Sequence, residues 1–138
     1  IKILAGLIKS SGYNNQKAKK IKEFIKFLDS GKEINRENLL SVWGIGKETA
    51  DSILLYAYNK KIFVIDAYTK RIFNRIGFNE RDYDKLQNLF MNNLEKDVDL
   101  YKEYHALLVE HGKNICKTKP LCSKCCLNKI CGYPNIIS

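Results

Sequence analysis

The chain has 138 residues, of which 45% are apolar, and a formal net charge of +9. Enough apolar residues are present to bury the core of one or two small domains. A chain this basic is typical of proteins that meet polyanions, nucleic acid above all, although a generally lysine-rich composition would give the same charge.

The sequence predicts no membrane segment and no secretory leader. No run of 18 apolar residues occurs, so we expect no membrane-spanning helix. No signal peptide is visible, and the five cysteines are an odd number, which indicates a reducing compartment. We therefore expect a cytoplasmic protein.

The first part of the chain predicts helices separated by turns. Residues 1–9 begin inside an apolar pattern without a starting Met, and we interpret them as the end of a helix in a fragment. A helix is expected over 15–29, with apolar residues at spacings of three and four and lysines on the other faces. These lysines are expected to face solvent, although Lys17 could instead meet phosphate. A shorter helix over 37–42 precedes Trp43, which we expect in the core.

Two glycines, Gly44 and Gly46, separate this helix from the next one, expected over 47–58. Glycine lets the backbone turn tightly and leaves room for another molecule to approach. The turn leads into a helix N-terminus, whose N–H groups and dipole favour an anion such as phosphate. A tight turn between two packed helices remains the alternative reading of this feature alone.

An apolar run over 62–65 ends at Asp66, where a helix over 67–76 would begin. Aspartate at such a place is commonly a structural N-cap. Two further helices are expected, over 82–94 and 97–113. The second of them carries two histidines, which we interpret as structural residues: His105 and His111.

Four cysteines near the end of the chain follow the pattern C-x5-C-x2-C-x5-C: Cys116, Cys122, Cys125 and Cys131. Structural zinc usually takes two close cysteine pairs separated by a dozen or more residues. A single close pair flanked by two loops instead suits thiolates wrapped around a compact iron–sulfur cluster. Zinc stays the alternative. A fifth cysteine, Cys126, is expected to be a small packed residue.

The pattern L-x-x-V-x-G-I-G-K-E-T-A-D-x-I-L, followed by V-I-D-A-Y-T-K-R-I, resembles the helix-hairpin-helix DNA glycosylases of the endonuclease III superfamily. The resemblance runs over about residues 3–133. That family has a C-x6-C-x2-C-x5-C loop holding a [4Fe–4S] cluster, just after a segment like His111-Gly112. The first gap of the present chain is one residue shorter.

The resemblance implies an all-α helix-hairpin-helix glycosylase fold, here a partial six-helix domain with a C-terminal iron–sulfur loop. Residues 1–98 would form the DNA-binding and catalytic domain, which is N-terminally incomplete, and residues 99–138 the last helix and the cluster loop. The expected partner is double-stranded DNA containing a damaged base. The protein would act as a monomer at the nucleoid of a prokaryotic cell.

In the family, hairpin amides hold a DNA phosphate, and an aspartate at the position of Asp66 is catalytic. The resemblance therefore implies five DNA-contacting residues: Gly44, Ile45, Gly46, Lys47 and Thr49. An ionised Asp66 would stabilise positive charge on the sugar and orient the attacking water. The target base must leave the duplex to be reached, and Glu48 and Tyr68 are candidate residues of its pocket.

Bifunctional members of the family place a lysine immediately before the Thr-Ala pair, where this chain has Glu48. Lys47 lies one residue earlier, and one helical step turns a side chain by roughly 100°. A carboxylate cannot form an imine with the sugar, so we expect a monofunctional enzyme. The run G-K-E-T-A-D-x-I-L-x-Y-A most resembles the branch that excises alkylated purines such as 3-methyladenine. The alternatives are an endonuclease III-like glycosylase/lyase for oxidised pyrimidines and a non-catalytic DNA-binding module.

Overall fold

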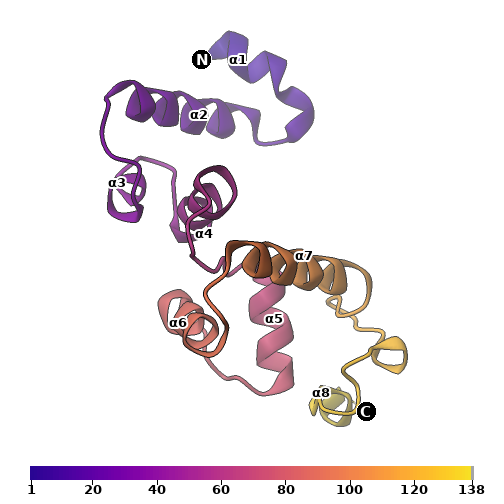
Figure 1. The fold of residues 1–138 in the computed structure, drawn as a ribbon. Coiled ribbons are helices and arrows are strands. Elements are labelled where there is room, and N and C mark those ends of the chain that lie inside the picture. The colour runs from indigo at the N-terminus through magenta and orange to yellow at the C-terminus, as the bar shows by residue number, and fades with distance from the viewer. Residues whose placement is uncertain (138) are drawn as a thin grey trace. The chain divides into compact units, whose positions relative to one another are not determined.

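The computed structural model describes residues 1–137, and no strand occurs among them, which confirms the expected all-α class (Figure 1). The α-helices are, in chain order, α1 (Lys2–Leu7), α2 (Asn14–Asp29), α3 (Arg36–Leu40), α4 (Lys47–Ser52), α5 (Ala67–Ile76), α6 (Tyr83–Asn93), α7 (Val98–Asn114) and α8 (Tyr133–Ile137). Short helical turns lie between some of them: η1 (Lys9–Ser11), the π-helical η2 (Ile53–Ala57) and η3 (Cys122–Lys124). None of the described helices is long and apolar enough to cross a membrane.

The chain forms two compact units, Ile1–Ala50 and Asp51–Ser138. The first contains α1 to α3 and the start of α4, and the second contains the remaining helices and the cysteines. The functional division expected between residues 98 and 99 stays a prediction.

In the first unit, α1 packs against α2, and small apolar residues such as Ala5 and Ala18 are buried there. Asn35 is the N-cap of α3, and its side chain accepts a hydrogen bond from the Asn38 N–H at 2.8 Å. The prediction that Trp43 packs in the core is wrong. Its side chain is 49% exposed, and the Lys19 Nζ atom lies 4.0 Å from the ring centre. Trp43 therefore offers its ring face to the Lys19 ammonium at the surface.

The core of the second unit is built where α5 packs against α7. Phe63 is fully buried and stacks on Phe90 of α6 with ring centres 4.3 Å apart. Tyr101 of α7 meets the same ring edge-on at 5.4 Å. Burial of one such side chain stabilises a fold by about 1.5–3 kcal/mol, so this aromatic cluster holds α6 and α7 around the segment that precedes Asp66.

That segment, residues 63–65, is buried and belongs to no helix or strand of the described chain. Side chains of α6 supply its hydrogen bonds instead. Gln87 Nε2 donates to the Phe63 carbonyl at 2.8 Å, and the Ile65 N–H donates to Tyr83 Oη at 3.3 Å. Buried backbone groups need such partners. The segment is thereby fixed, and with it the start of α5.

Candidate active site and cysteine loop

Asp66 is the N-cap of α5, as an aspartate directly before a helix predicts. Its Oδ1 atom accepts a hydrogen bond from the Thr69 N–H at 2.7 Å. Its Oδ2 atom lies 2.9 Å from Nε2 of His105, which belongs to α7. Only 6% of Asp66 is exposed. The carboxylate is therefore held from two sides, by its own helix and by a neighbouring one.

Sequence reasoning missed the contact with His105, because 39 residues separate the two side chains and no local spacing connects them. The histidine also contacts Tyr56, whose Oη atom lies 2.6 Å from His105 Nδ1. An ionised carboxylate can only accept, so Nε2 of His105 donates to Asp66. In a neutral imidazole Nδ1 then accepts from the hydroxyl of Tyr56. Three side chains thus form one hydrogen-bonded chain.

This environment sets the charge of Asp66. Burial alone would raise its pKa, but the hydrogen bonds from His105 and the Thr69 N–H outweigh burial, and the pKa lies below the ordinary value of 3.8. Burial and the negative charge of Asp66 raise the pKa of Tyr56 above 10.0. At neutral pH, Asp66 is therefore a carboxylate and Tyr56 keeps the proton that it donates.

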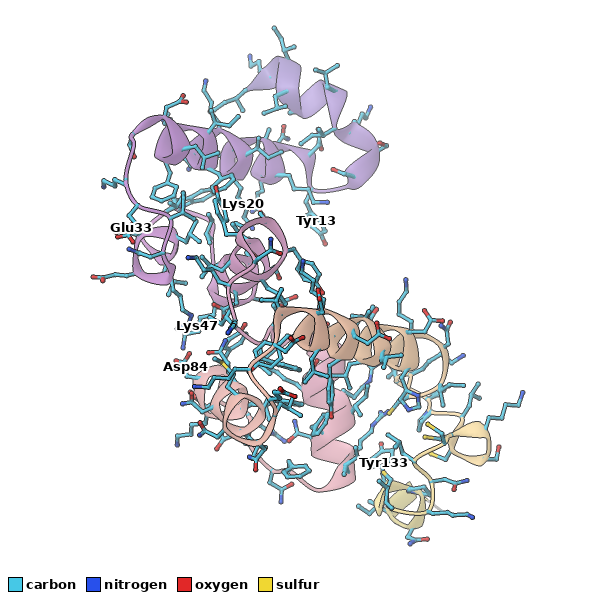
Figure 2. The ribbon with its side chains drawn as sticks, in the orientation of Figure 1. Tyr13, Lys20, Glu33, Lys47, Asp84 and Tyr133 are labelled. Atoms are coloured by element: carbon cyan, nitrogen blue, oxygen red, sulfur yellow. The ribbon has the colours of Figure 1, made fainter. Side chains whose placement is uncertain are left out.

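The glycine hairpin (Gly44–Gly46) lies in the other unit. Gly44 has φ 87°, and a Cβ atom added there would lie 2.5 Å from Cγ of Lys20. Figure 2 shows Lys20 on the side of α2 that faces the start of α4. Gly46 has neither constraint, since nothing lies within 4 Å of its Cβ position. The positive φ and the nearby Lys20 side chain therefore require glycine at position 44, whereas a Cβ atom at position 46 would meet no neighbour.

The residues expected to meet DNA are mostly at the surface. Gly44, Gly46, Lys47 and Thr49 are exposed, and Ile45 is partly buried. Their contact with a phosphate stays a prediction.

The two candidate pocket residues differ in their surroundings. Glu48 is exposed in the first turn of α4. The Tyr68 ring instead lies against α7: a Cβ atom on Gly112 would be 2.5 Å from Tyr68 Cδ1. The Arg71 guanidinium is 5.3 Å from the same ring centre. Part of the role of Tyr68 is therefore packing, and a place in the base pocket stays a prediction for both residues.

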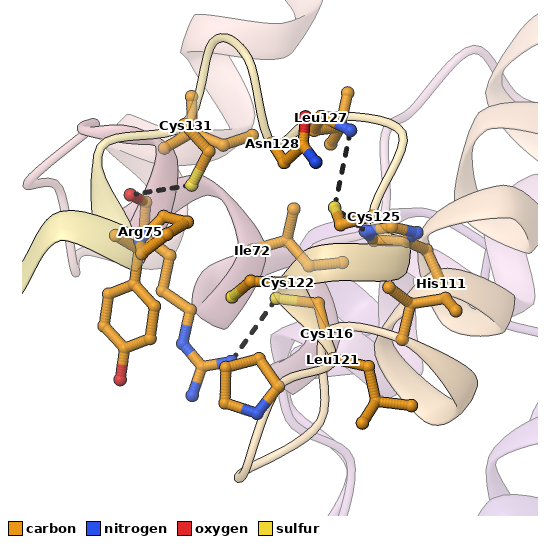
Figure 3. A pocket seen from close by; sticks show the side chains of 15 residues that line it. Ile72, Arg75, His111, Cys116, Leu121, Cys122, Cys125, Leu127, Asn128 and Cys131 are labelled. Carbon is orange, nitrogen blue, oxygen red and sulfur yellow. Dashed lines mark hydrogen bonds between the residues drawn. The ribbon is translucent and has the colours of Figure 1, made fainter. Parts of the chain in front are cut away.

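The four cysteines of the spaced motif line one pocket, between the end of α5, the end of α7 and the cysteine loop, residues 116–131. Figure 3 shows their sulfur atoms around this pocket, with Arg75 on one side and His111 on the other. None of the five cysteines is paired in a disulfide. Within residues 1–137, no three His, Cys, Asp or Glu side chains are placed to hold a single metal ion as they stand.

Hydrogen-bond donors surround the sulfur atoms. Arg75 Nη1 lies 3.3 Å from Cys116 Sγ, and the Leu127 N–H lies 3.4 Å from Cys125 Sγ. Arg75 also donates to the carbonyls of Lys117 and Thr118, at 2.6 and 3.1 Å. These donors can stabilise charge on sulfur, whereas burial raises the pKa of the Cys125 thiol despite the Leu127 N–H.

The fifth cysteine, Cys126, stands outside this set. It does not line the pocket of the other four, and the prediction that it is no ligand stays a prediction. It is exposed, however, so the expectation that it packs inside is wrong.

Comparisons with known proteins identify the family of this chain. Residues 2–96 match the model of the HhH-GPD superfamily base excision DNA repair proteins. A Methanocaldococcus jannaschii protein, which carries the name of a DNA repair glycosylase, is 47% identical over 93% of this chain and 65% of its own length. This chain thus spans a little under two thirds of that relative.

Two solved structures are similar in fold. An endonuclease III–DNA complex superposes with a TM-score of 0.84 at 23% identity, covering 99% of this chain and 66% of that one. A 3-methyladenine DNA glycosylase of H. pylori, bound to 1,N6-ethenoadenine, gives a TM-score of 0.72 at 32% identity. That match covers 81% of this chain and 62% of the other.

Proposed function

The chain belongs to the HhH-GPD superfamily of base excision DNA repair proteins, and on that premise we propose that it is the DNA-binding and catalytic part of a DNA glycosylase. The enzyme would hydrolyse the N-glycosidic bond of a damaged base in double-stranded DNA, acting as a monomer. The observation that carries the proposal is the Asp66 carboxylate, held ionised at the start of α5 by Thr69 and His105.

The chemistry depends on this carboxylate. Loss of a base leaves positive charge on the sugar, and a nearby anion stabilises that charge more in the transition state than in the substrate. The same carboxylate can orient or deprotonate the attacking water. The damaged base would have to leave the helical stack before Asp66 could reach the sugar carbon. The exposed hairpin would hold the DNA backbone through main-chain N–H groups.

We propose an alkylated purine as the damaged base, with 3-methyladenine as the example. Glu48 stands where bifunctional relatives have lysine, and a carboxylate forms no Schiff base. A 3-methyladenine DNA glycosylase is 32% identical to this chain and an endonuclease III is 34% identical, so the choice rests on Glu48. A methylated purine already carries positive charge and leaves readily, so one carboxylate suffices for its release.

The second candidate is an endonuclease III-like glycosylase/lyase for oxidised pyrimidines, in which Lys47 supplies the amine. Its support is the exposed position of Lys47 beside Glu48 and the fold shared with endonuclease III. A non-catalytic DNA-binding module is the third reading, and the ionised Asp66 argues against it.

The four cysteines of the pocket would hold a [4Fe–4S] cluster, with zinc as the alternative. Zinc requires each thiolate at about 2.3 Å from one ion, whereas a four-iron cluster is larger and spreads its ligands more widely. The four thiols that line one pocket would supply the four ligands that such a cluster takes. The bound cluster would supply a structural anchor, and it would order a loop whose exposed lysines can meet phosphate: Lys117, Lys119, Lys124 and Lys129.

The test uses the full-length protein and three duplexes, containing 3-methyladenine, thymine glycol or an abasic site. We expect release of free 3-methyladenine and no covalent product when borohydride is added to the abasic duplex. Asp66→Asn should lower the release rate by about 10²-fold or more while DNA binding persists. Release by that variant at the parent rate would refute the role of Asp66. Borohydride trapping would instead establish the lyase.

A further inference from the structure

We infer that His105, oriented by Tyr56, is a positioning residue that holds the Asp66 carboxylate in one fixed orientation. The inference rests on the proposed function, because it concerns the same carboxylate. It assigns a role to two side chains that neither the sequence motif nor the helix cap requires.

The two carboxylate oxygen atoms of Asp66 have different hydrogen-bond partners. The bond from the Thr69 N–H to Oδ1 is an ordinary helix cap, made within three residues. Rotation about the last torsion of an aspartate is otherwise broad. The second bond, from His105 Nε2 to Oδ2 at 2.9 Å, comes from another helix and fixes the plane of the carboxylate. A structural cap needs only the first bond.

The contact with Tyr56 determines which nitrogen of His105 carries the proton. An imidazole can present either nitrogen, and the partner of one nitrogen determines which proton the other carries. Tyr56 Oη lies 2.6 Å from Nδ1, and the two rings are tilted by 52° with centres 5.8 Å apart. The raised pKa of Tyr56 keeps its hydroxyl a donor. His105 is thereby held with its Nε2 proton toward Asp66.

Tyr56 reaches His105 because of the turn in which it lies. Tyr56 lies in η2, a π-helical turn, and η2 contacts α7. Such turns are rare and frequently occur at functional sites. Exposure also decreases along the three residues: Tyr56 is 44% exposed, whereas the side chains of His105 and Asp66 are 17% and 8% exposed. The two hydrogen bonds therefore lead from Tyr56 at the surface, through His105, to the buried Asp66 carboxylate.

The experiment compares three substitutions of His105 in the full-length, cluster-containing protein. Leucine keeps bulk and removes the donor. Glutamine places an amide N–H near the former Nε2 atom, whereas asparagine is too short to do so. The readouts are the single-turnover rate of base release at saturating enzyme, the DNA dissociation constant and the thermal midpoint.

We expect His105→Leu and His105→Asn to release base about tenfold to hundredfold more slowly, the effect of losing a hydrogen bond to a charged group. DNA affinity should stay unchanged. His105→Gln should remain within about threefold of the parent, because its donor is retained. Tyr56→Phe should slow release in the parent and have no further effect in the His105→Leu background, where no imidazole is left to orient.

Two results would overturn the inference. Equal losses for the leucine and glutamine variants, following their thermal midpoints, would show that the ring only packs. A parent-like rate for His105→Leu would show that Asp66 needs no second partner. Asp66→Asn is measured alongside: if it is inactive in the latter case, the inference fails while the proposed function stands. If Asp66→Asn is fully active, both fail together.

Discussion

Gln87 Nε2 donates a hydrogen bond to Asp51 Oδ2 at 2.8 Å, and both side chains are buried. Tyr83 Oη donates to the same oxygen, also at 2.8 Å. Gln87 and Tyr83 in turn hold the backbone of residues 63–65. A carboxylate at the end of α4 therefore orients the two side chains that fix the segment before Asp66.

Replacement of Asp51 by leucine should lower the free energy of unfolding by roughly 1–3 kcal/mol, because the buried Gln87 amide and the partly buried Tyr83 hydroxyl each lose one acceptor. Chemical denaturation measures the change. Glu95→Leu is the control, since Glu95 is exposed in the same unit and surface changes usually stay within about 0.5 kcal/mol. Equal effects of the two substitutions would contradict the role assigned to Asp51.

The two hairpin glycines should respond differently to alanine. Gly44→Ala should cost roughly 1–2 kcal/mol, because alanine disfavours a positive φ and its methyl group would displace the Lys20 side chain. Gly46→Ala meets no such barrier and should leave the fold unchanged. If the hairpin holds a phosphate, Gly46→Ala should nevertheless weaken DNA binding. Thermal unfolding and a DNA titration separate the two effects, and a stable Gly44→Ala protein would contradict the conformational argument.

The charge of Asp66 should also be visible in acid. Its folded pKa is lowered below 3.8, so its charge contributes stability that is present above the unfolded value, about 3.9, and is lost as pH falls through the folded value. The difference in unfolding free energy between the parent and Asp66→Asn should therefore shrink as pH drops below about 4. Denaturation curves between pH 2.5 and 5.5 measure it. A difference that grows in acid would mean that the pKa is raised instead.

Exchange of single cysteines should separate the four pocket thiols from the fifth. Cys126→Ser should keep about four irons per chain, the number in a [4Fe–4S] cluster, because Cys126 is exposed and lies outside the pocket. Cys125→Ser should lose most of the iron. Metal analysis and visible absorption give the readout. Retention of zinc and no iron by the parent protein would replace the cluster with the alternative metal.

The sequence predicted most of the fold because its signals are local. Apolar spacing located α2, α5, α6 and α7 to within one or two residues, and the aspartate before α5 was correctly read as its cap. The prediction for Trp43 is wrong, because a lone tryptophan beside a turn belongs to no periodic pattern that would assign it to a face.

The features that sequence reasoning missed depend on contacts between distant residues. Asp51 looks like a polar position on a helix, yet it is fully buried because α6 brings two donors to it. The π turn also left no trace, since the apolar residues of η2 fit an ordinary helix equally well. The pairing of His105 with Asp66 arises only when α5 and α7 pack together.

The π turn has a consequence for how this chain tolerates length changes. A π-helical turn holds more residues than an α-helical turn, so η2 is equivalent to a one-residue insertion in a regular helix. Deleting one residue of it would restore regular winding and rotate Tyr56 by about 100° relative to the residues on the other side of the deletion. The hydroxyl would then miss His105, even where the deleted residue is Ile53, which is not among the buried residues of η2. In this helix a deletion is therefore more damaging than most substitutions, because the extra residue sets the direction in which the Tyr56 side chain points.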